Sequence, residues 1–75
     1  DLERARVIAH EYRRRSRDEE MKPFDLQVTI PGKQDMAEAS RANLRLQYAD
    51  IQTKMDEANS VEELESLVKS LNFYY

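Results

Sequence analysis

The sequence predicts a mostly α-helical fold of three helices, with one extended or β segment between the first two. Apolar residues recur at spacings of three and four over most of the chain, which places them on one face of a helix. The chain has one glycine and two prolines, all between positions 23 and 32. Only residues 24–30 alternate apolar with polar side chains. The predicted helices cover about residues 1–21, 35–58 and 60–72.

The first predicted helix, residues 1–21, has an apolar stripe in its first half only. That stripe consists of Leu2, Ala5, Ile8, Ala9 and Tyr12. Residues 13–20 contain no apolar side chain, so we expect this half to project into solvent or to meet a charged surface. We expect Lys22 to end the helix, because a residue that precedes a proline is disfavoured in the α conformation.

Residues 24–30 show the period-2 pattern that is typical of a β-strand with one apolar face. The apolar positions are Phe24, Leu26, Val28 and Ile30, and Pro31-Gly32 follows as a turn signal. A lone strand leaves backbone donors and acceptors unpaired. The strand would therefore pair with its copy across a homodimer or with a strand of another protein. The third alternative is an extended segment that lays these side chains over the helices.

The central helix, residues 35–58, has two apolar faces. The larger face carries Ala37, Leu44, Tyr48, Ile51, Met55 and Ala58, and the opposite face carries Ala39, Ala42, Leu46 and Ala49. Asp35 followed by Glu38 predicts a capping box at its start. We expect the third helix to pack on the larger face. We expect the first helix, from the same chain or swapped from a second copy, to pack on the small-residue face.

Ser60 followed by Glu63 is a second capping-box pattern and predicts a third helix antiparallel to the central one. Its apolar stripe consists of Val61, Leu64, Leu67, Val68 and Leu71. The tail Phe73-Tyr74-Tyr75 is strongly apolar. It either continues the apolar face of the third helix or forms an exposed anchor for a partner.

The composition predicts one small domain, residues 1–75, whose core is limited. Apolar residues make up 40% of the chain and charged residues 36%, and there is no cysteine. A chain of this size gains no more than about 3–5 kcal/mol from one core, so association with a partner is a common additional source of stability. We expect a cytoplasmic protein, because the absence of cysteine fits a reducing compartment. No apolar run reaches the roughly 20 residues of a transmembrane helix, so we expect no membrane partner.

Catalytic or cofactor-binding chemistry is not indicated by any residue pattern. His10 is the only histidine and is expected on the solvent flank of the first helix. One glycine in the chain excludes a glycine-rich phosphate loop. The acidic residues lack the spacing and the central glycine of a calcium loop. We therefore expect no enzyme, no cofactor and no metal site.

Four arginines form the most concentrated charge feature, and they are Arg13, Arg14, Arg15 and Arg17. Such a cluster could bind phosphates. However, residues 18–20 are all acidic, the net charge of the chain is −3, and no aromatic side chain is interleaved to stack on bases. Phosphate binding by these arginines is therefore the alternative hypothesis.

The predicted order strand, helix, helix between Phe24 and Leu71 resembles the ribbon-helix-helix family of dimeric DNA-binding repressors. The resemblance implies strands that pair across the dimer axis and place polar side chains in the major groove. The sequence departs from the family pattern in two ways. Asp25 would face the phosphates, and the helix after the strand is longer than that fold expects.

These features predict a non-catalytic protein–protein interaction module: a small helical adaptor, regulator or assembly factor that acts as a homodimer. The residues expected to bind a partner are Phe24, Leu26, Val28, Ile30, Phe73, Tyr74 and Tyr75. The alternative is a small nucleic-acid-binding regulator that uses the arginine cluster.

Overall fold

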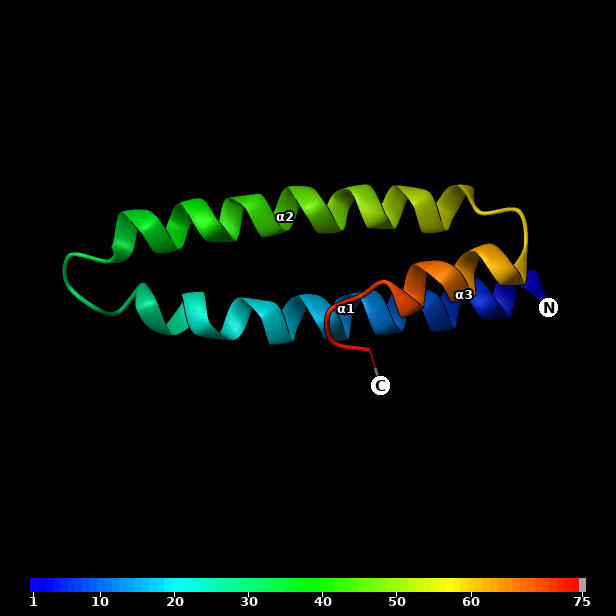
Figure 1. Cartoon of the computed structure of the whole chain (residues 1–75), viewed down its shortest axis with the longest axis horizontal. Helices are drawn as coiled ribbons and strands as arrows, with labels where there is room; N and C mark the ends of the chain where they lie inside the picture. Colours follow the sequence, from blue (N-terminus) through cyan, green and yellow to red (C-terminus); the bar gives the residue numbers. More distant parts are fainter. Residues whose placement is uncertain (75) are drawn as a thin grey trace.

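A computed structural model of the chain describes residues 1–74 and contains three helices, α1 (Leu2–Gln27), α2 (Gln34–Glu57) and α3 (Val61–Lys69). α1 and α2 form a long antiparallel hairpin, and the short α3 lies along the N-terminal half of α1 (Figure 1). The molecule is elongated, with extents of 48 × 20 × 15 Å. The predicted mostly α-helical class is confirmed, and α2 lies within one residue of its predicted bounds.

α1 continues through Pro23 and ends at Gln27, so the predicted end of the helix at Lys22 is wrong. A proline inside a helix costs stability because it has no N–H to donate to the preceding turn. The helix continues because Met21 and Phe24, one turn apart, both pack against the apolar cluster that α2 contributes to. Burial of these two side chains offsets the cost of the proline.

The predicted strand over residues 24–30, its pairing across a homodimer and the extended-segment alternative are wrong, because residues 24–27 are helical and turns follow. Alternating positions also contain spacings of four, which suit a helix. Phe24 and Val28 are accordingly half-buried, whereas Leu26 is 68% exposed. Gly32 has φ of 85°, and a positive φ at this turn favours glycine. The resemblance to the ribbon-helix-helix family is not supported either, because it depends on a strand in this segment.

α2 begins without the predicted capping box of Asp35 and Glu38. Its N-cap residue is Lys33, which makes no side-chain capping bond. Glu38 Oε1 instead accepts a hydrogen bond of 2.8 Å from Nη1 of Arg41. Asp35 lies in the first turn, where a carboxylate stabilises the positive end of the helix.

Only the larger apolar face of α2 is covered, so the predicted packing of α1 on the small-residue face is wrong. Leu46 on that small-residue face is 71% exposed, and its alanines are exposed as well. α1 and α3 both pack on the larger face, and they also pack on each other. The buried apolar residues are Ala9, Ala37, Leu44, Tyr48, Met55, Ala58, Leu64, Val68 and Leu71.

The second half of α1, expected in solvent, packs against α2 through a chain of hydrogen bonds. The backbone N–H of Phe73 donates to Oγ of the fully buried Ser16 over 3.2 Å. The Tyr48 hydroxyl donates to the Glu20 carboxylate, so the Ser16 hydroxyl, 2.7 Å away, must donate to Tyr48. Burial and the bond to Glu20 raise the pKa of Tyr48 to about 12.

The capping box predicted at the start of α3 is formed in part, because Ser60 caps the Glu63 N–H but the Glu63 carboxylate bonds the N–H of Asn59 rather than that of Ser60. Ser60 Oγ accepts a bond of 3.2 Å from the Glu63 N–H, and the Glu63 carboxylate accepts one of 3.1 Å from the Asn59 N–H. α3 ends at Lys69, earlier than the predicted end near residue 72. Leu71 beyond the helix is still buried, which fits its place in the predicted apolar stripe.

Candidate protein-interaction surface

An open apolar groove of about 250 Å³ lies between α1 and α3, and no residue of α2 lines it. α1 contributes two alanines, an isoleucine and a tyrosine to its lining, and α3 contributes three aliphatic and two charged side chains. Glu65 and Lys69, which form an ion pair of 3.0 Å, lie at the edge. The apolar lining residues are Ala5, Ile8, Ala9, Tyr12, Val61, Leu64, Val68 and Tyr74.

The rim of this groove gathers several of the large apolar side chains that the fold leaves in solvent. Ile8 is 44% exposed, and Val61 and Tyr74 are exposed to a similar degree. Val7, the neighbour of Ile8 on α1, is 58% exposed. We define the α1/α3 face as this groove with its exposed lining residues Ile8, Val61 and Tyr74, together with the adjacent Val7.

Two charged residues on α1 flank this face without any partner in the described part of the chain. Arg4 lies one turn before Ile8 and Glu11 lies one turn after it, and both are exposed. Neither makes a hydrogen bond or an ion pair within residues 1–74. By contrast, the exposed Glu3 and the half-buried Glu19 on the same helix pair with Arg6 and Lys22.

The C-terminal tail closes one end of the groove. The Tyr74 ring lies 5.9 Å from the Tyr12 ring, measured between centroids, and the Arg15 guanidinium lies 5.3 Å above the Tyr12 ring. Phe73 is half-buried, and its backbone N–H is held by Ser16. The tail therefore both continues the packing of α3 and exposes one aromatic ring.

The predicted partner-binding residues do not come together on one surface. Tyr74 lies at the α1/α3 face, whereas Leu26 and Ile30 are exposed at the far end of the α1–α2 hairpin. Phe24 and Val28 are half-buried within that hairpin. The last predicted residue, Tyr75, lies outside the described residues.

The four-arginine cluster is also divided by the fold. Arg13 is buried, and its Nη1 donates to Oε1 of Gln52 on α2 over 3.4 Å. Burial and the nearby charges of Arg14 and Arg17 lower the pKa of Arg13. Arg14 and Arg15 are exposed, and Arg17 Nη2 lies 3.5 Å from Asp18 Oδ1.

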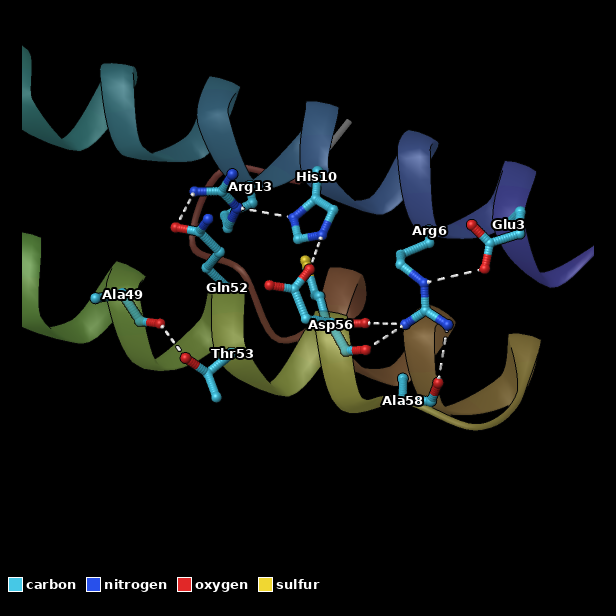
Figure 2. Close-up of polar contacts among 10 residues, drawn as sticks. Glu3, Arg6, His10, Arg13, Ala49, Gln52, Thr53, Asp56 and Ala58 are labelled. Atoms are coloured by element: carbon cyan, nitrogen blue, oxygen red, sulfur yellow. Dashed lines mark hydrogen bonds and ion pairs between the residues drawn. The ribbon is translucent and has the colours of Figure 1, made fainter.

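A polar network fastens α1 to the C-terminal end of α2 (Figure 2). Arg6 Nη1 donates to the carbonyl oxygens of Met55 over 2.6 Å and Asp56 over 2.8 Å, and Nη2 donates to that of Ala58 over 3.3 Å. The last carbonyls of a helix have no partner within the helix. Arg6 therefore stabilises the end of α2 from the neighbouring helix.

His10 belongs to the same network and does not lie on the solvent flank as predicted. Its Nδ1 accepts a hydrogen bond of 3.1 Å from Arg13 Nε, and its Nε2 lies 2.8 Å from Asp56 Oδ1 (Figure 2). Because Nδ1 accepts, the ring proton is on Nε2 and is donated to the carboxylate. Both ring nitrogens are thus used in joining α1 to α2.

Sequence reasoning missed a basic cleft of about 480 Å³ between α1 and α2. Two of its cations come from each helix, and they meet only when the hairpin forms. Three of the four cations are paired with a nearby carboxylate: Arg41 with Asp25 over 3.2 Å, Arg17 with Asp18 over 3.5 Å and Lys22 with Glu19 over 2.6 Å. Arg45 is exposed and makes no hydrogen bond or ion pair within the described residues. The cleft is lined by Arg17, Asp18, Met21, Lys22, Asp25, Arg41 and Arg45.

Comparisons of this chain with protein-family models, with curated proteins and with solved structures find no match. Within residues 1–74, no group of three or more His, Cys, Asp or Glu side chains is placed to hold a metal ion. None of the helices in that part of the chain is long and apolar enough to cross a membrane.

Proposed function

We propose that this chain is a non-catalytic protein–protein interaction module that self-associates through the α1/α3 face. The observation that carries the proposal is the exposure of Ile8, Val61 and Tyr74 around one apolar groove, with the exposed Val7 next to Ile8 on α1. Contiguous exposed apolar side chains with a polar rim are typical of protein interaction sites. A second copy is the occupant that the charges favour, because the unpaired Arg4 and Glu11 are of opposite sign.

The limited size of the chain supports this proposal. A core of this size supplies little stability by itself, and association buries apolar surface that one copy leaves in water. α3 covers only part of α1, so the outer edge of α1 has no neighbour along Val7 and Ile8. A second helix laid on this edge would cover both side chains.

Light scattering after size-exclusion chromatography tests the proposal with a matched pair of variants. The mass of the wild-type protein is expected to rise from 8.9 kDa towards twice that value as the concentration increases. We expect the transition between about 10 µM and 1 mM, which corresponds to a free energy of association of about −4 to −7 kcal/mol. Ile8→Asp should remain a single chain, because it places a charge in the apolar centre.

Leu46→Asp is the control, because Leu46 is a large exposed aliphatic side chain on the outer side of α2. It should associate as the wild type does. A wild-type mass of one chain at every concentration would contradict self-association. Equal loss of association in Ile8→Asp and Leu46→Asp would contradict the assignment to the α1/α3 face.

A second candidate function, a nucleic-acid-binding regulator, is supported by the basic cleft rather than by residues 13–17 alone. Arg17 and Arg45 line the cleft from two helices, and Arg45 has no acidic partner within the described residues. Phosphate binding predicts an affinity that falls steeply with salt. Fluorescence anisotropy with a labelled DNA duplex should then show binding at low salt that Arg45→Glu weakens at least about tenfold. Absence of binding to DNA and RNA at low salt would exclude this candidate.

A further inference from the structure

We infer that two copies of the chain pair through α1 in antiparallel orientation, with Arg4 of each copy against Glu11 of the other. The inference rests on the proposed function, because it specifies how a second copy occupies the α1/α3 face. It is carried by the order of exposed side chains along α1, by the two unpaired charges and by the apolar groove beside them.

The exposed face of α1 has a charge pattern that is complementary to itself. Arg4, Val7, Ile8 and Glu11 follow one another at helical spacing, and all four are exposed. A two-fold axis that crosses α1 between Val7 and Ile8 places Arg4 and Glu11 at equal distances on either side. With a rise of 1.5 Å per residue, that distance is about 5 Å along the helix. Each Arg4 then faces Glu11 of the second copy.

The opposite, parallel orientation is disfavoured by the same residues. It would place Arg4 against Arg4 and Glu11 against Glu11, and like charges across an interface oppose association. The antiparallel orientation forms two Arg4–Glu11 pairs instead. Charge complementarity therefore selects both the partner, a second copy, and its direction.

The apolar side chains at the centre fit the same arrangement. Near the two-fold axis, Val7 meets Val7 of the second copy on one side of the contact, and Ile8 meets Ile8 on the other. Ile8 also lines the groove with Val61, so the second Ile8 enters at the rim of an apolar hollow. The interface thus has an apolar centre and a charged rim, which is the usual composition of a protein–protein interface.

The outer face of α2, which also exposes a large aliphatic side chain, lacks this self-complementarity. Leu46 has Asn43 and Asp50 one turn away on its two sides, and Asp50 already pairs with Lys54 over 3.0 Å. None of the positions one turn from Leu46 carries a cation that could meet the Asp50 carboxylate of a second copy in the same way. The α1 face is therefore the better site for a symmetric pair.

Charge reversal tests the pairing directly. Sedimentation equilibrium should show that Arg4→Glu and Glu11→Arg each raise the dimer dissociation constant at least about tenfold, because each creates two like-charge contacts. The double variant Arg4→Glu/Glu11→Arg restores opposite charges and should return to within about threefold of the wild type. Arg45→Glu is the control, since it makes the same charge change at an exposed arginine on α2 and should leave the constant unchanged.

Cysteine cross-linking gives a second readout that does not depend on affinity, because the chain has no cysteine of its own. Ile8→Cys lies next to the two-fold axis and should form a disulfide between copies under mild oxidation. Arg4→Cys should not, since the two positions are about 10 Å apart along antiparallel helices and a disulfide needs Cα atoms within about 7 Å. Cross-linking of both variants would indicate the parallel orientation.

The outcomes separate this inference from the proposed function. Loss of dimer in both single variants with recovery in the double variant supports the antiparallel pairing. A wild-type dimer that neither single reversal weakens, or that the double variant fails to restore, overturns the pairing but leaves self-association in place. A wild-type protein that is monomeric up to about 1 mM, where an association worth only about 4 kcal/mol would already form dimers, overturns both.

Discussion

Replacing Tyr48 by phenylalanine tests the hydrogen-bond chain that joins α1, α2 and the C-terminal tail. The Tyr48 hydroxyl is in the middle of this chain: it accepts from Ser16 and donates to Glu20. Tyr48→Phe removes both bonds and keeps the buried ring. The fully buried Ser16 hydroxyl then has no acceptor for its proton, and Glu20 loses a donor.

The expected loss of stability follows from the groups left behind. A net hydrogen bond contributes about 0.5–1.5 kcal/mol, and one to a charged group about 1.5–3 kcal/mol. Glu20 is half-exposed and still accepts from Nδ2 of Asn72, so part of its loss is recovered. We therefore expect Tyr48→Phe to lower the free energy of unfolding by about 1–3 kcal/mol. For a domain of this size, this corresponds to a decrease in Tm of roughly 5–20 °C.

The raised pKa of Tyr48 adds a pH dependence with a defined sign. Below pH 10 the hydroxyl is protonated in the folded and the unfolded chain, so its titration does not affect stability. Between pH 10 and about 12 the unfolded chain releases a proton that the folded chain retains, so stability falls as pH rises. Tyr48→Phe should lose this part of the alkaline decrease.

Thermal unfolding followed by circular dichroism at pH 7 and pH 11 measures both effects. Tyr74→Phe is the control, because its ring is exposed and no hydrogen bond of its hydroxyl is found within the described residues. It should unfold within about 0.5 kcal/mol of the wild type, as surface changes do. If Tyr48→Phe unfolds at the same temperature as Tyr74→Phe at pH 7, the hydrogen-bond chain does not stabilise the fold.

Two further variants probe the core and the polar network. Met55→Ala should cost about 2–5 kcal/mol in urea unfolding, because the side chain is fully buried, whereas the exposed Met36→Ala should change little. Arg6→Ala should cost about 1–3 kcal/mol in the same assay, because it leaves three carbonyl groups at the end of α2 without their donor. Arg45→Ala, at an exposed arginine, is its control and should be nearly neutral. Equal stabilities within either pair would refute the corresponding contact.

The helices that could be predicted are those whose signals agree with one another. α2 has a long apolar stripe without glycine or proline, and its bounds follow from that pattern. α3 has the stripe and a capping box, and Ser60 and Glu63 make the predicted bond. Both signals are local, so the helix that they predict does not depend on what the rest of the chain packs against.

The segment around Phe24 could not be assigned correctly, because its pattern suits two structures. Apolar side chains at every second position also contain pairs four residues apart, such as Phe24 and Val28. Pro23 then suggested a break that the packing of Met21 and Phe24 against α2 overrides. The choice depends on a tertiary contact, which the local pattern does not contain.

The candidate interaction surface was predicted at Tyr74 alone. Ile8 and Val61 belong to the apolar stripes of their helices, so the sequence predicts them to be packed against a neighbouring helix. They remain exposed because α1 and α3 share one face of α2, which leaves the edges of both stripes uncovered. The apolar stripe of α1 and the adjacent Val7 together form a surface that is wider than one neighbouring helix covers. This width is the sequence signal for an exposed apolar surface on α1.

Backbone amide chemical shifts measured by NMR while the protein is diluted from 1 mM to 10 µM test self-association through the α1/α3 face most directly. Self-association through this face predicts concentration-dependent shifts at Val7, Ile8, Glu11 and Val61, with no change at Leu46. Shifts centred on Leu46, or a spectrum that does not change with concentration, would contradict it.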